Sequence, residues 1–253
     1  KIIEIEVEEK PTGEISAGAG IGTNGGSVSF VVSENNWLGK GMGVAASLEA
    51  SAETFSGSIS VSDPNFNFSG NSLNYFLSNS TNDKPNSGYK NNIITTGIGT
   101  SFEQYRNVYL SPNLSLSYDD LKVESTASES LKKQKGSFTD LSFSYAISLD
   151  NRDKVYAPTD GYLSSFSQAI PIYADSPYLR NTYSFSKYKT LTPNAIGTFK
   201  LYATVINGLN DKDVRLSKRV NLSANRLRGF ESGKVGPKDG IDYIGGNYAM
   251  ASN

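Results

Sequence analysis

A two-residue alternation, repeated along almost the whole chain, is the feature that most constrains the fold. Apolar side chains at 42, 44, 46, 48 and 50 alternate with small or polar ones, and residues 55–62 and 141–149 repeat the pattern. Successive side chains of a β-strand point to opposite faces of its sheet. About a dozen such segments, several of them about ten residues long, predict an all-β chain with too many long strands for an ordinary sandwich.

The residue types on the second face decide between two all-β architectures. A soluble sandwich usually carries Lys, Glu and Arg on its outer face, whereas here the second face is mostly Ser, Gly, Thr and Asn. We therefore expect a transmembrane antiparallel β-barrel with an apolar face toward lipid and a small polar face toward a wet lumen, and a soluble β-domain remains the alternative. The residues expected to face lipid are Leu48, Ile59, Leu116 and Phe143, and those expected to face the lumen are Ser47, Ser58, Ser117 and Ser144. Tyrosines expected to anchor the membrane interface are Tyr75, Tyr105, Tyr109, Tyr118, Tyr145, Tyr162, Tyr173 and Tyr202.

The composition excludes most familiar chemistry. The chain has no His and no Cys, which removes a histidine base, a thiolate nucleophile, disulfides and the commonest zinc and iron sites. Its 24 Lys plus Arg balance 25 Asp plus Glu, so no overall charge attracts nucleic acid. Carboxylates at strand ends (Asp119, Asp120, Asp150 and Asp153) are expected to be solvated or to form turns. We predict a protein that is not an enzyme and has no cofactor or metal.

Both ends of the chain suggest an excerpt from a longer protein. Residues 1–10, "KIIEIEVEEK", alternate like a half-buried strand with one charged face, and the character of the sequence changes after "PTG", which places a domain boundary near residues 11–13. The last residues, "GGNYAMASN", resemble the start of another strand. We expect the strands that close the barrel to lie beyond Asn253.

Glycines at 20, 22 and 25 have the spacing of a dinucleotide-binding loop. Such a loop must open a helix, yet "SVSFVVS" follows, which is typical of a strand. The sequence instead predicts a Gly-rich strand over residues 14–22 that turns at residues 24–26 into a hairpin partner.

Several ordered segments resemble the BamA family of outer-membrane barrel-assembly insertases. "VEEKPTGEISAGAGIGTNGGSVSF" resembles the junction between that family's last periplasmic POTRA domain and its first barrel strand, and "ENNWLGKGMGVAASLEAS" its first hairpin. "LDNRDKVYAPTDGYLSSFS" resembles a mid-barrel segment, and "LRGFESGKVGPKDGIDYIGGNYAM" the signature loop with the start of the next strand. TamA and the mitochondrial sorting-and-assembly barrel share the fold and a similar signature.

The resemblance implies a domain division and a set of site residues. Residues 1–12 would end the last POTRA domain, and residues 13–253 would form the N-terminal and central part of a barrel of roughly 16 strands, about 12 to 13 of them in this chain. In a loop folded into the lumen, Arg228 would contact acidic groups of the inner wall, Gly229 would allow a tight backbone and Phe230 would pack beside it. Gly245, Gly246 and Asn247 would begin the next strand. The lateral seam would lie along Ile15, Ala17, Gly18, Ala19, Gly20, Ile21 and Gly22.

The function implied is assembly of outer-membrane β-barrel proteins in a Gram-negative bacterium. The implied partners are unfolded barrel clients, accessory lipoproteins bound through upstream POTRA domains, and outer-membrane lipid. A TamA-like or two-partner-secretion transporter, a passive pore in which Arg228 lines the channel, and a secreted adhesive β-protein remain alternatives.

Overall fold

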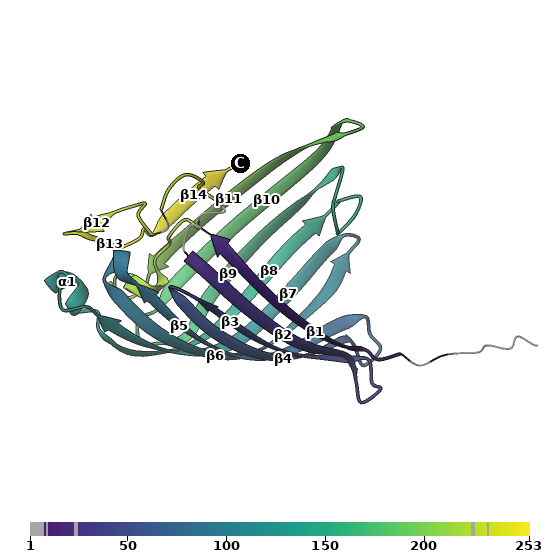
Figure 1. Cartoon of the computed structure of the whole chain (residues 1–253), viewed down its shortest axis with the longest axis horizontal. Coiled ribbons are helices and arrows are strands. Elements are labelled where there is room, and N and C mark those ends of the chain that lie inside the picture. Colours follow the sequence, from purple (N-terminus) through teal and green to yellow (C-terminus); the bar gives the residue numbers. More distant parts are fainter. Residues whose placement is uncertain (1–7, 9, 23–24, 224–225, 232) are drawn as a thin grey trace, which may run out of the picture.

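The computed structural model describes residues 8, 10–22, 25–223, 226–231 and 233–253 and is dominated by one antiparallel sheet (Figure 1). Its 12 strands follow chain order from β1 to β11 and end with β14. The strands are β1 Gly13–Gly22, β2 Gly25–Trp37, β3 Met42–Ser51, β4 Thr54–Phe66, β5 Asn71–Lys84, β6 Tyr89–Tyr105, β7 Val108–Val123, β8 Gly136–Asp150, β9 Gly161–Ala174, β10 Tyr178–Thr192, β11 Ala195–Gly208 and β14 Tyr248–Ser252. The predicted all-β barrel architecture is confirmed.

The remaining elements are short. They are the 3-10 turns η1 Pro85–Ser87 and η2 Leu216–Lys218, the helix α1 Glu129–Lys132, and a small hairpin of β12 Lys238–Asp239 with β13 Asp242–Tyr243. Within the described ranges, no helix has the length and apolar character needed to cross a membrane.

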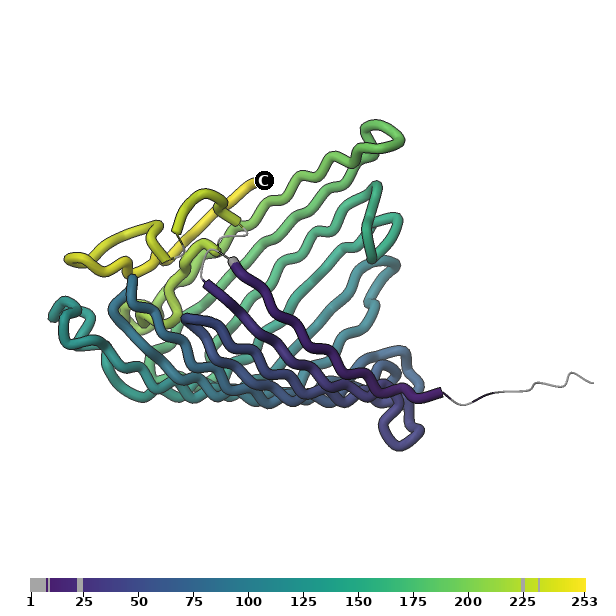
Figure 2. The backbone as a smooth tube through the Cα atoms, in the orientation of Figure 1, coloured from purple at the N-terminus to yellow at the C-terminus, as the bar shows by residue number. Residues whose placement is uncertain are grey.

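The strands tilt and the sheet curls, so that β1 and β2 lie in front of β7 to β9 in the view of Figure 1. Tight turns at residues 38–41, 67–70, 106–107 and 193–194 lie at the end where β1 begins, which we call the turn end. The opposite end, which we call the loop end, carries α1, the β12–β13 hairpin and the long loop 209–247 (Figure 2).

Strand register shows that the sheet has two chemically different faces. Ser47 pairs with Ser58, and their hydroxyls lie 2.7 Å apart on one face, which we call the inner face. Leu48 and Ile59 project from the other, outer face and are 53% and 55% exposed. Leu116 and Phe143 lie on the same outer face, and Ser117 and Ser144 on the inner one. The alternation predicted from the sequence is confirmed.

Two of the tyrosines assigned to the membrane interface were predicted wrongly. Tyr109 pairs with Ser148, and Ser148 donates to Ser165 on the inner face. Tyr202 also faces inward, where the guanidinium of Arg226 covers its ring. Because register alone decides the face of a strand residue, a tyrosine near a strand end can point to either side.

The glycine-rich beginning of the sheet forms strands rather than a nucleotide loop. Gly20 and Gly22 belong to β1, and Gly25 opens β2, with Gly22 paired to Gly25. The predicted strand over residues 1–10 falls almost entirely outside the described residues, as does Asn24 of the predicted turn.

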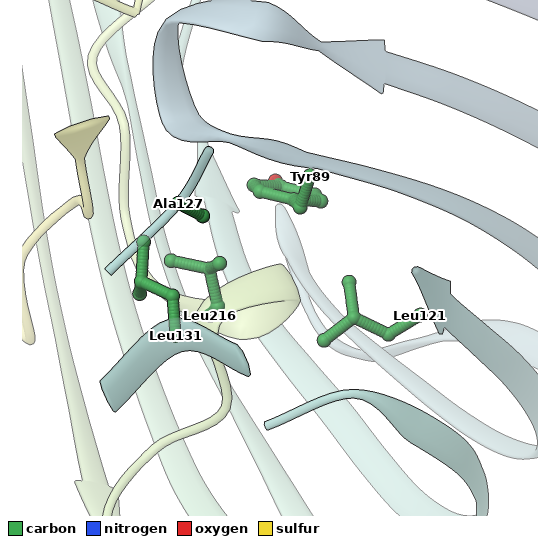
Figure 3. Close-up of a cluster of buried hydrophobic side chains, with 5 residues drawn as sticks. All are labelled: Tyr89, Leu121, Ala127, Leu131 and Leu216. Atoms are coloured by element: carbon green, nitrogen blue, oxygen red, sulfur yellow. The ribbon is translucent and has the colours of Figure 1, made fainter. Parts of the chain in front are cut away.

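A small hydrophobic core lies at the loop end (Figure 3). Leu121, Leu131 and Leu216 are 1% exposed or less and pack with Tyr89 and Ala127. These residues come from β6, β7, the α1 region and η2, so the core joins the long loop 209–247 to the wall of the sheet.

Candidate functional site

The first strand is an edge of the sheet. All ten residues of β1 pair with β2, from Gly13 opposite Glu34 to Gly22 opposite Gly25. Within the described residues, no strand pairs with its other side. In a closed barrel the backbone N–H and C=O groups along that side would pair with the closing strand, so β1 lies at the junction where the barrel would close.

The predicted seam residues divide between the two faces of β1. Ala17 pairs with Phe30 and Ile15 with Val32, which places Ile15, Ala17, Ala19 and Ile21 on the outer, apolar face. Gly18 and Gly20 lie on the inner face, opposite Ser29 and Ser27. A Cβ on Gly18 would lie 3.0 Å from the Ser29 hydroxyl, so a larger residue at this position would crowd Ser29 of β2.

Hydroxyls cover the inner wall farther along the sheet. Ser101 and Ser111 lie 2.8 Å apart, and Ser148 donates to Ser165 at 2.9 Å. A hollow of about 190 Å³ on this wall is lined by side chains that include Ser111, Ser144, Ser167, Thr182 and Arg180. A wall of hydroxyls that satisfy one another and still accept water suits a wet interior.

The long loop is tied to this wall by a buried ion pair. Arg215 of the loop contacts Asp140 of β8, and both side chains are 3% exposed. Lys218 Nζ lies 3.6 Å from the same carboxylate, and the Arg215 guanidinium lies 4.3 Å from the centre of the Phe138 ring. Two cations on one carboxylate hold the beginning of the loop against the sheet.

A second buried carboxylate supports the same region. Asp119 of β7 accepts from the Asn91 amide at 2.9 Å and from the Ser217 hydroxyl at 2.7 Å. Arg180 of β10 donates to the Lys218 carbonyl at 2.8 Å. The expectation that Asp119 is solvated is wrong, because the loop folds over it and supplies a donor.

The sequence analysis did not predict these anchors, although the sequence contains a signal for them. Asp119 follows Ser115 and Ser117 on the inner face of β7, and Asp140 precedes Ser142 and Ser144 on the inner face of β8. A carboxylate that interrupts a run of inward hydroxyls needs a donor from elsewhere in the chain, and this indicates a loop contact.

The Arg-Gly-Phe motif occupies a different part of the loop. Arg228 is exposed and forms no ion pair with any described residue, while Phe230 is 57% exposed. Gly229 has a φ of 85°, the left-handed conformation that the motif was expected to need. Two residues earlier, Arg226 lies 3.5 Å from the centre of the Tyr202 ring on the inner wall. Of the two arginines it is Arg226, and not Arg228, that contacts the inner wall within the described residues.

The Gly-Gly-Asn motif directly precedes the last strand. Gly246 exchanges two backbone hydrogen bonds with Val220, at 2.8 and 2.9 Å, and the Asn247 carbonyl accepts from Ile206 of β11. Gly245 has a φ of 69° and lies where a Cβ would be 3.0 Å from the Val220 carbonyl. The glycines thus let the loop close tightly before β14 joins β11.

The other strand-end carboxylates are structural. Asp150 forms a two-point ion pair with Arg152, at 2.7 and 2.8 Å. Asp153 accepts from the Thr159 backbone at 2.9 Å and from the Thr159 hydroxyl at 2.5 Å, and these bonds hold the pKa of the Asp153 carboxyl well below its usual range. Asp120 lies 3.7 Å from Lys122. The described residues contain no cluster of acidic side chains suited to a metal ion.

An apolar outer face, a hydroxyl-lined inner face and a loop packed against the inner wall define a transmembrane β-barrel sheet. The Omp85 superfamily domain matches residues 36–253. The chain belongs to the Omp85 superfamily, and its fold and relatives place it in an outer membrane.

The relatives agree with this membership. The outer membrane protein assembly factor BamA of Neorickettsia risticii is 27% identical over 98% of this chain and 34% of its own length. A SAM50-like protein of Schizosaccharomyces pombe is 28% identical over 98% of this chain and 54% of that protein. The crystal structure of Haemophilus ducreyi BamA lacking POTRA domains 1–3 superposes with a TM-score of 0.85 at 21% identity, over 97% of this chain and 53% of that one. The chain thus spans about a third to a half of these relatives.

Proposed function

We propose that this chain forms part of a factor that folds and inserts β-barrel proteins into the outer membrane, with β1 as the strand that receives its clients. The observation that carries the proposal is the position of β1 as the first strand of the sheet, with a glycine-rich inner face, in a chain that belongs to the Omp85 superfamily. Unpaired backbone groups in hydrocarbon cost several kcal/mol each, so separation of β1 from the closing strand would favour pairing of β1 with an incoming strand.

The composition of β1 supports reversible pairing. Gly18 and Gly20 give its inner face no side chains with which to pack against a neighbour, and every residue from Gly13 to Ile21 is exposed. Glycine weakens a strand, so such an edge exchanges partners more readily than one rich in β-branched residues. The glycines would equally leave room for a lumen loop beside β1.

The partners follow from the same proposal. The clients are unfolded outer-membrane β-barrel proteins, and outer-membrane lipid surrounds the outer face. Residues 1–12 would end a periplasmic POTRA domain, and accessory lipoproteins would bind through upstream POTRA domains. Pairing of strands needs no covalent chemistry, in keeping with a protein that is not an enzyme. In the full-length protein, Arg228 would find acidic partners on strands beyond Asn253.

Photo-crosslinking in the full-length protein tests the receiving strand. Crosslinkers at Ile15, Ala17 and Ala19 should trap nascent outer-membrane proteins, while the same group at Phe166, on the outer face of β9, should not. Crosslinks confined to Phe166 would contradict the proposal. A passive pore or transporter would instead give steady conductance in planar bilayers without client crosslinks at β1.

A further inference from the structure

Two turns at the turn end repeat one structural unit. The first spans residues 34–41, which are the end of β2 and the turn to β3, and the second spans residues 63–70, which are the end of β4 and the turn to β5; each contains the register shift of its hairpin. In the first, Asn36 Oδ1 accepts from the Gly41 N–H at 2.7 Å. In the second, Asn65 Oδ1 accepts from the Gly70 N–H, also at 2.7 Å.

The backbones of the two turns also agree. Leu38 and Asn67 have φ values of 54° and 53°, and the next residues, Gly39 and Phe68, have 69° and 56°. This left-handed conformation suits Gly39, but it is strained for a bulky side chain such as that of Phe68. Because the first turn is built with glycine at the equivalent position, the turn itself does not require a phenylalanine.

The Phe68 side chain is not packed against the described part of the protein. It is 95% exposed, so no described residue covers its ring. A strained backbone that presents a large apolar side chain away from the protein indicates a contact outside it.

The location of the turn identifies that contact. Phe66 pairs with Asn71 and Trp37 with Met42, which places both aromatic rings on the outer face at the last position of their strands. The outer face is the lipid-facing one, and aromatic side chains at strand ends lie at the membrane interface. Phe68 extends this aromatic row beyond the end of the strand.

We propose that the tip of the second turn is an interfacial anchor, in which the Phe68 ring enters the bilayer at the boundary between headgroups and acyl chains. Its neighbours Asn67 and Ser69 carry no charge to be desolvated, and the Asp63 carboxylate is engaged by the Asn65 N–H at 3.0 Å. The anchor sets the depth of the β4–β5 hairpin, close to the β1 edge. This proposal depends only on the position of the sheet in the membrane and not on the function proposed above.

An environment-sensitive fluorophore tests the anchor directly. The full-length protein, with every other cysteine removed, carries Phe68→Cys labelled with a nitrobenzoxadiazole group and is folded into phosphatidylcholine vesicles. The label should emit at shorter wavelength than in water and be quenched by lipids that carry a spin label near the headgroup end of the acyl chain. Ile241→Cys, in a 78% exposed position at the loop end, is the matched control and should be quenched by aqueous iodide.

A second pair of variants tests the contribution of the Phe68 ring alone. With the label on Ser69→Cys, changing Phe68 to Gly should keep the turn, because the first turn folds with glycine, and should reduce lipid quenching by about twofold or more. Iodide quenching at position 68 equal to that at Ile241, or unchanged lipid quenching in Phe68→Gly, overturns the proposal. Shielding that appears only when accessory subunits are added would show a protein contact instead and would also overturn it.

Discussion

Arg215 and Asp140 form an ion pair that is almost fully buried between the long loop and the inner wall, across 75 residues of sequence. Lys218 contacts the same carboxylate, while one Asp140 oxygen and two Arg215 nitrogens have no hydrogen-bond partner in the described structure. Removing one member of such a buried pair destabilises a protein far more than replacing both members with apolar residues.

Removing one partner should therefore loosen the loop. Arg215→Ala leaves the Asp140 carboxylate with Lys218 alone, and breaking a buried pair in this way typically costs 3–5 kcal/mol, so about that loss is expected here. The measurement is the protease sensitivity of loop 209–247 in folded protein. The control is Lys90→Ala, which breaks a half-exposed pair with Asp83 and should cost about 0–1 kcal/mol.

Replacing the whole charged cluster should restore much of the loss. Lys218 is only 13% exposed and would lose its partner if Asp140 were changed, so the triple variant Arg215→Met, Lys218→Met and Asp140→Leu is needed to leave no buried charge. This triple variant is expected to be more protease-resistant than Arg215→Ala alone. A triple variant as sensitive as the single one would show that the ion pairs, and not an isolated buried charge, hold the loop.

The two faces should differ in their tolerance of charge. Arg at Ile59, on the outer face, should cost about 2–4 kcal/mol near the bilayer midplane, whereas Arg at the neighbouring inner-face Ser58 should cost much less. Folding titrations into lipid vesicles measure both. Equal costs would mean that the outer face is not the lipid face.

The loop over residues 151–160 should resist acid. Bonds from Thr159 and Asp160 depress the pKa of Asp153 in the folded state, so its contribution to stability is fully present above the unfolded pKa and is lost only as pH falls through the lower, folded value. The hydrogen-exchange protection factors of this loop, which are corrected for the intrinsic pH dependence of exchange, should stay constant between pH 7 and about 5. Asp153→Ala should lower these protection factors throughout that range, and Lys154→Ala, which leaves the acceptor in place, should not. Wild-type protection that fades already at about pH 6 would contradict this assignment.

Arg226 and Arg228 should behave differently in their contacts with the inner wall. Arg226→Ala removes a cation–π contact with Tyr202, which should cost about 0.5–2 kcal/mol and expose the loop to protease. If acidic partners lie on later strands, Arg228→Ala should also expose the loop, but only in the full-length protein. If the protease sensitivity of the loop is unchanged in Arg226→Ala, the contact with Tyr202 does not stabilise the loop.

The strands could be predicted from the sequence because their signal is local. Leu141, Phe143 and Tyr145 alternate with Ser142 and Ser144, and that period alone places them on opposite faces. The same reasoning excluded a nucleotide loop at Gly20, because a strand and not a helix follows it.

The pattern indicates a loop contact at Asp119 and Asp140, but the residues of the long loop that make this contact could not be predicted from it. Arg215 meets Asp140, and Ser217 meets Asp119, only because the loop folds back across the sheet, and no spacing in the sequence encodes that return. The resemblance directed attention to Arg228, whereas the described contacts are made by Arg226 and Arg215. The repeated turns were missed as well, because their similarity lies in backbone conformation more than in residue identity.

The central claim is that a client strand pairs with β1, and a cysteine-pair scan tests it most directly. Single cysteines from Glu14 to Ile21 in the full-length protein are combined with single cysteines along the terminal strand of a client barrel, and disulfides are trapped during assembly. If the client adds to the sheet as a strand, disulfide yield should alternate with a period of two along β1 and shift in step with the client register. Disulfides without that alternation, or none above the yield at a β9 position such as Phe166, would contradict the claim.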